Sequence, residues 1–133
     1  MIEKNFSKII EDYLQKMNID PSSVILQENT WLIHQKNSSV CIMTIGGFII
    51  FQSPIMHCPK QNVQTFYRKL LELNENAEET LGASFGINSH NEIMLKFLYP
   101  IQNMDFDTFS YLLTSIAHVA DKQSKELKEK FDF

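Results

Sequence analysis

The pattern of hydrophobic residues predicts that the chain is organised around a central amphipathic helix. Apolar side chains recur at the spacing of one helical face, at Val63, Phe66, Tyr67, Leu70 and Leu71. The positions between them are mostly charged or polar. One face of this helix is therefore expected to be buried, while the opposite face contacts water.

Two further segments have the periodicity of a helix. Residues 6–17 form the first, which is expected to end before Asp20-Pro21-Ser22-Ser23, because proline restricts the preceding residue and Asp and Ser favour turns. The last helix is expected to begin after Asp105, whose carboxylate can cap it. Its apolar stripe reaches Ala120, and the mostly charged segment 121–129 is expected to extend past the core.

Three consecutive segments predict a meander of antiparallel strands, at residues 31–35, 40–45 and 48–52. They are rich in β-branched and aromatic residues, and the Ser53-Pro54 pair is expected to break the third strand. The second and third strands do not alternate apolar with polar residues. Both faces of these strands are therefore expected to be partly dry.

A second hairpin is predicted after the central helix, where residues 83–87 and 93–99 flank a polar turn. Residues 76–80 are polar and predict a loop, whereas residues 24–27 predict a short strand. The resulting order is helix, three strands, helix, two strands and helix. This order predicts one α+β domain over residues 1–133, with an antiparallel sheet of about five strands and three helices.

Composition narrows the possible partners. The chain has 133 residues, 44% of them hydrophobic and 21% charged, as in an ordinary globular domain. Its 12 basic and 16 acidic residues offer no basic surface for a phosphate backbone, so nucleic acid is not an expected partner. Residues 1–20 contain no apolar run of the length of a signal peptide core, and no run in the chain approaches the length of a membrane span, so no membrane contact and a cytoplasmic location are expected.

Candidate catalytic chemistry is limited to the adjacent His57 and Cys58, and neighbours in sequence usually point apart. The four histidines lack the spacing of metal ligands, and the four glycines fit no nucleotide-binding motif. Cys41 and Cys58 are expected to stay reduced. The sequence therefore predicts no catalytic, metal-binding or cofactor-binding residue, and the chain is not expected to be an enzyme.

The apolar strands predict an interface with another polypeptide. Three helices are too few to cover both faces of a five-stranded sheet, so we expect a homodimer at micromolar concentration. The central helix and the neighbouring hairpin are the first candidates for its contact. Candidate protein-contact residues are Phe48, Ile50, Phe66, Tyr67 and Leu70.

Several segments carry a resemblance to a known family: Ser53-Pro54-Ile55 with Pro59, residues 66–74 (FYRKLLELN), Phe85-Gly86-Ile87 and the helix start at Asp105. With the order of elements, they resemble the YbjN family of the type III secretion chaperone-like fold, over nearly the whole chain. The resemblance implies a curved antiparallel sheet, frequent dimerisation, and no catalytic residues. It also implies kinship with the small acidic Tir chaperones, which hold secretion effectors in extended form.

Three hypotheses about function follow. The first is a non-enzymatic, chaperone-like module that holds or regulates a client protein. The second is a self-associating small regulatory protein of the YbjN type, without a secretion client. The third and least favoured hypothesis is a thiol enzyme that uses Cys58, because no Asp or Asn that would orient a catalytic His can be identified.

Overall fold

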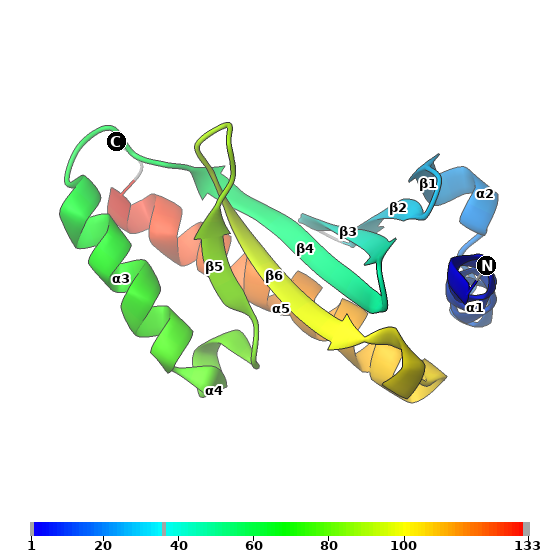
Figure 1. The fold of residues 1–133 in the computed structure, drawn as a ribbon. Coiled ribbons are helices and arrows are strands. Elements are labelled where there is room, and N and C mark those ends of the chain that lie inside the picture. Colours follow the sequence, from blue (N-terminus) through cyan, green and yellow to red (C-terminus); the bar gives the residue numbers. More distant parts are fainter. Residues whose placement is uncertain (1, 36, 132–133) are drawn as a thin grey trace.

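The computed structural model describes residues 2–35 and 37–131, which contain one six-stranded antiparallel sheet. Its strand order is β1-β2-β3-β4-β6-β5, so β1 and β5 are the edge strands (Figure 1). The strands are β1 (Ile25–Gln27), β2 (Thr30–Gln35), β3 (Ser38–Ile45), β4 (Phe48–His57), β5 (Ser84–Ile87) and β6 (Glu92–Pro100).

The helices gather on one side of the sheet and at its two ends. They are α1 (Ile2–Lys16), α2 (Pro21–Val24), α3 (Val63–Glu75), α4 (Ala77–Thr80) and α5 (Phe106–Phe131), with a 3₁₀ turn at Ile101–Asn103. The long α5 runs behind the sheet, α1 and α2 lie at the β1 end, and α3 lies beside β5 (Figure 1). The predicted α+β class is confirmed, although the strands and helices exceed the expected five and three.

The core lies between α5 and the inner face of the sheet, which is the face turned toward α5. One row of paired residues crosses this face, from Trp31 through Ile42 and Phe51 to Phe97. The first three are fully buried, and the Phe51 ring lies 5.7 Å from that of Phe109 on α5. Aromatic and β-branched side chains thus fill the space between the two layers.

The Ser53-Pro54 pair does not end β4, contrary to the prediction. The strand continues to His57, and its pairing with β6 shifts register between Pro54 and Met56. A bulge tolerates a residue that lacks an N–H, so proline can be accommodated there. Ser53 is fully buried, and its hydroxyl donates to the carbonyl oxygen of Ser39 at 2.6 Å.

Two segments predicted to be turn, loop or strand form short helices instead. Residues 77–80 form α4, where a loop was expected. Residues 21–24 form α2, because Pro21 suits a first helical position and the Asp20 carboxylate accepts from the Ser22 N–H at 3.1 Å. The neighbouring strand therefore begins at Ile25 and not at Val24.

The charged end of α5 does not extend past the core, which corrects a second prediction. Leu127 and Phe131 are buried, because they continue the helical stripe at four-residue spacing while charged residues face the solvent. The Phe131 ring meets that of Phe66 on α3 edge-on, at 5.1 Å. The last turns of α5 therefore help to hold α3.

The predicted cap at the start of α5 is confirmed. The Thr108 N–H donates to Asp105 Oδ1 at 2.8 Å. Hydrogen bonds from Thr108 also hold the pKa of the Asp105 carboxyl below its usual value.

The burial of α3 leads to a stability prediction. Replacing Leu70, which lies in the core, by Ala should lower the free energy of unfolding by about 2 to 5 kcal/mol, as expected for a large-to-small core substitution. Urea unfolding measures this change. Leu71→Ala on the exposed face of the same helix is the control and should have little effect. Equal effects of the two substitutions would contradict this orientation of α3.

Candidate protein-binding surfaces

The face of the sheet turned away from α5, its outer face, is not crossed by any helix that the structure describes (Figure 1). Pairing across β3, β4 and β6 places five apolar side chains together there. We call this set the outer patch: Met43, Ile45, Phe48, Ile50 and Leu98. Ile45, Phe48 and Leu98 expose 57%, 43% and 53% of their surface, so the patch is open to solvent.

The outer patch ends at a row of more polar side chains. Gln52 pairs with Cys41 on one side and with Lys96 on the other. Burial raises the pKa of the Cys41 thiol, so this thiol stays neutral near neutral pH. Lys96 is exposed and places a positive charge beside the apolar residues.

A second apolar surface lies on α3, away from the core. Tyr67 and Leu71 are exposed there, and we call these two residues the α3 surface. The sequence predicted both on the buried face of this helix, which was wrong, because the buried face is formed by Phe66, Leu70 and Leu73. The Tyr67 hydroxyl lies 3.5 Å from the Cys58 sulfur. The hydrogen bond with Cys58, and then the charge of the Cys58 thiolate, raise the pKa of Tyr67.

The structure separates the five predicted contact residues. Phe48 and Ile50 lie side by side in the outer patch, while Tyr67 lies on the α3 surface. Phe66 and Leu70 face the core and are only 0% and 7% exposed, so they are not available to a partner in this conformation.

Sequence reasoning missed Met43, Ile45, Leu71 and Leu98. The first two could have been found by pairing β3 with β4 around the Gly46-Gly47 turn, because the strands meet in register Met43 to Ile50 and Ile45 to Phe48. Leu98 could not be found in this way, since β6 pairs with β4 from a distant part of the sequence.

The His57-Cys58 pair does not form a catalytic arrangement in this structure. His57 is the exposed last residue of β4. The Cys58 sulfur contacts the Tyr67 hydroxyl and, at 3.7 Å, the Pro59 carbonyl oxygen, and neither contact involves the imidazole. Within residues 2–35 and 37–131, no group of three or more His, Cys, Asp or Glu could hold a metal ion.

None of the helices described is long and apolar enough to cross a membrane.

Comparison with known families identifies the chain. A family model described as the Tir chaperone protein (CesT) family matches residues 8–122. The chain belongs to this family. The resemblance noted from the sequence is thereby confirmed at the level of the chaperone-like fold, and no curated protein matches the sequence.

Solved structures share this fold at low sequence identity. A chain of the heterodimeric ExoU–SpcU complex from the type III secretion system of Pseudomonas aeruginosa has a TM-score of 0.70 and 14% identity, covering 87% of this chain and 95% of that chain. The Yersinia pestis type III secretion chaperone SycH in complex with a YscM2 fragment gives 0.67 and 13%, covering 89% and 98%. YbjN from E. coli gives 0.60 and 12%, covering 84% and 85%.

The contact between Cys58 and Tyr67 gives a prediction for this Tir chaperone family member. Cys58→Ala should lower the pKa of Tyr67 toward its ordinary value, because the neighbouring sulfur opposes ionisation of the hydroxyl. Nuclear magnetic resonance titration of the tyrosine rings measures this shift, with Tyr111 as an internal reference on α5.

The same variant tests whether the thiol has a chemical role. Cys58→Ala should keep the fold, cost at most about 3 kcal/mol of stability, and leave partner binding unchanged. Loss of a measurable turnover, with the fold retained, would contradict the non-enzymatic interpretation of this chain.

Proposed function

We propose that this chain is a chaperone-like protein that holds or regulates a client protein by binding an apolar segment of it on the outer patch. The observation that carries the proposal is the exposure of Ile45, Phe48 and Leu98 side by side on a sheet face that none of the described helices covers. Large exposed apolar patches are uncommon on soluble monomers and often mark interaction sites.

Family membership supports the same proposal. The chain belongs to the Tir chaperone family, and the structural relatives include a type III secretion chaperone in complex with a fragment of YscM2. Gln52 and Lys96 lie at the border of the outer patch. They would face the polar part of a client segment that binds there. A client is therefore expected to place apolar side chains over Phe48 and Leu98.

The proposal includes the absence of catalysis and a cytoplasmic location. It rests on an apolar surface for binding and not on a reactive group, since the Cys58 sulfur contacts a tyrosine hydroxyl and a carbonyl oxygen rather than a base.

We further propose that the protein is a homodimer, joined through the α3 surface. Tyr67 and Leu71 are exposed on a helix at one end of the sheet, and Ile87 is exposed on the neighbouring edge strand β5 (Figure 1). A symmetric contact would place these side chains against their copies. The outer patch would remain open to a client.

The alternative is a self-associating regulatory protein without a client. The fold shared with YbjN and the exposed α3 surface favour this alternative. The two functions differ in whether the outer patch binds another protein.

A capture experiment tests client binding. The immobilised full chain should retain a stoichiometric protein from native lysate, and the double variant Phe48→Ser/Leu98→Ser should retain at least about tenfold less, because it removes the apolar contact. Quantitative mass spectrometry measures the retained protein. Tyr111→Ser, which changes an exposed aromatic residue on α5, is the control. Unchanged capture by the double variant would contradict the proposal, and no capture by the unaltered chain would favour the alternative.

Light scattering coupled to size exclusion tests the dimer. The expected mass is about 31 kDa, twice the 15.5 kDa of the chain. Leu71→Glu should shift the mass toward the monomer, because it places a charge in the proposed contact, whereas Tyr111→Ser should not. A mass of 15.5 kDa that persists for the unaltered chain at about 100 µM would reject the dimer.

A further inference from the structure

A hollow of about 280 Å³ continues the outer face of the sheet beyond the outer patch, over β4, β6 and β5. Strand pairing places Gln52, Lys96 and Ser84 in one row across this face, and Met94 and Gly86 in the next row. We call the space lined by these five residues the Gly86 hollow. Pockets for small molecules usually measure about 300 to 1,000 Å³, so the Gly86 hollow has room for a side chain rather than for a whole ligand.

Neither the backbone nor the packing requires a glycine at position 86. Gly86 does not have a positive φ, and a Cβ at this position would meet no atom within 4 Å. Gly82 differs, because its φ is 93° and a Cβ there would lie 3.0 Å from the ring of Phe97. Glycine weakens a strand, and in a strand it often marks a place where a ligand or another chain approaches closely. At position 86 its effect is to keep the hollow open, since a side chain there would extend into it.

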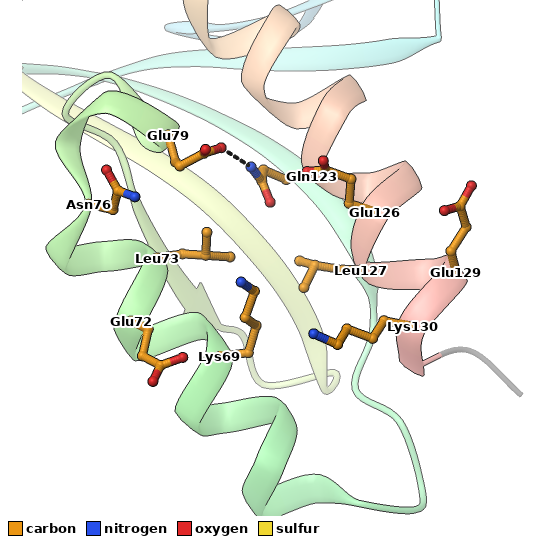
Figure 2. A pocket seen from close by; sticks show the side chains of 10 residues that line it. All are labelled: Lys69, Glu72, Leu73, Asn76, Glu79, Gln123, Glu126, Leu127, Glu129 and Lys130. Carbon is orange, nitrogen blue, oxygen red and sulfur yellow. Dashed lines mark hydrogen bonds between the residues drawn. The ribbon is translucent and has the colours of Figure 1, made fainter.

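Among the described residues, Lys96 is the one charged side chain that lines the Gly86 hollow, and it belongs to none of the ion pairs. The strands hold one further Asp, Glu, Lys or Arg residue, Glu92, which is four positions away on β6 and about 13 Å along the strand. Its Oε1 accepts from Asn88 Nδ2 at 3.1 Å. The larger groove between α3 and α5 is lined instead by four glutamates and two lysines (Figure 2). The Gly86 hollow thus has a net positive lining.

We propose that the outer face selects client segments that carry an acidic side chain close to their apolar residues. The carboxylate of the segment enters the Gly86 hollow beside Lys96, while its apolar side chains cover Phe48 and Leu98. Gln52 and Ser84, on either side of Lys96, offer hydrogen-bond donors to the same carboxylate. This inference rests on the proposed function and adds the chemistry by which the outer face distinguishes one client from another.

The distance between the outer patch and the hollow fits an extended segment. Leu98 and Lys96 are two residues apart on β6, so their side chains stand about 7 Å apart on the same face. An extended segment that runs along β6 turns every second side chain toward the sheet, at the same spacing. A carboxylate therefore reaches Lys96 when an apolar side chain two positions away covers Leu98. Water excluded by the apolar contact strengthens the attraction between the two charges.

Peptide titration of the full chain tests the proposal. The probes are acetyl-Ser-Leu-Ser-Leu-Ser-Glu-Ser-amide and the same peptide with Gln in place of Glu. Two-dimensional nuclear magnetic resonance should show shifts at the backbone amides of the outer patch with both peptides, and larger shifts at Gly86 and Lys96 with the Glu peptide. The Glu peptide should bind at least about threefold more tightly than the Gln peptide, and added salt should reduce this preference.

Two substitutions should abolish the preference for the Glu peptide by different means. Lys96→Gln removes the ammonium group, and Gly86→Leu fills the hollow, so each variant should bind the two peptides equally. Lys96→Arg keeps the charge and Gly86→Ala keeps most of the space, so both should retain the preference. Lys8→Gln makes the same change of net charge on α1 and should leave the preference unchanged. If Gly86→Leu impairs folding, Lys96→Gln still decides the question.

Equal binding of the two peptides by the unaltered chain would overturn this inference, as would a preference that Lys96→Gln retains or the absence of shifts at millimolar peptide. A loss of dimer mass in folded Lys96→Gln or Gly86→Leu would assign the hollow to a second copy of this chain and overturn the inference as well. Client binding on the outer patch is tested separately, by capture with Phe48→Ser/Leu98→Ser. The two proposals can therefore fail independently.

Discussion

The contact between α5 and the inner face of the sheet is the interaction on which the rest of the structure depends. Phe51 at the centre of the sheet packs against Phe109, and Tyr13 brings α1 to the same aromatic ring at 5.2 Å. Successive residues of a strand point to opposite faces, so burying Ile49 and Phe51 against α5 places Phe48 and Ile50 on the outer face. Because successive positions of these strands are apolar, burying one set of side chains against α5 leaves the other set on the outer face, where it forms the outer patch.

The length of α5 explains how α3 is held. The helix continues beyond the part that crosses the sheet, and its last turns supply Leu127 and Phe131 to the buried face of α3. Helix α3 meets the sheet mainly at the edge strand β5. Two helices that converge on the buried Leu73 and Leu127, with charged residues along their rims, leave a groove between them (Figure 2).

Local patterns predicted most of the fold but less of the candidate surfaces. Helical spacing identified α1, α3 and the start of α5, and residue type identified the meander and the hairpin. The extension of β4 through Pro54 depends on a bulge against β6, and the packing of Phe131 depends on α3, so neither follows from the local sequence. The apolar stripe of α3 predicted Phe66, Tyr67, Leu70 and Leu71 on one buried face, but only Phe66 and Leu70 of these four are buried. Leu73 completes the buried face, and this leaves Tyr67 and Leu71 exposed beside it.

An exposed apolar sheet face is a hazard when a free strand edge lies next to it, because edges pair readily with other chains. Asn74 of α3 occupies the free backbone groups of the edge strand β5 at one residue, Phe85. Its Oδ1 accepts from the Phe85 N–H at 2.7 Å, and its Nδ2 donates to the Phe85 carbonyl oxygen at 3.3 Å. The carboxamide thereby takes both hydrogen-bonding groups that a neighbouring strand would use at this residue. Asn74 therefore opposes extension of the sheet by β pairing at Phe85, and the proposed dimer contact would depend on side chains such as Tyr67 and Leu71.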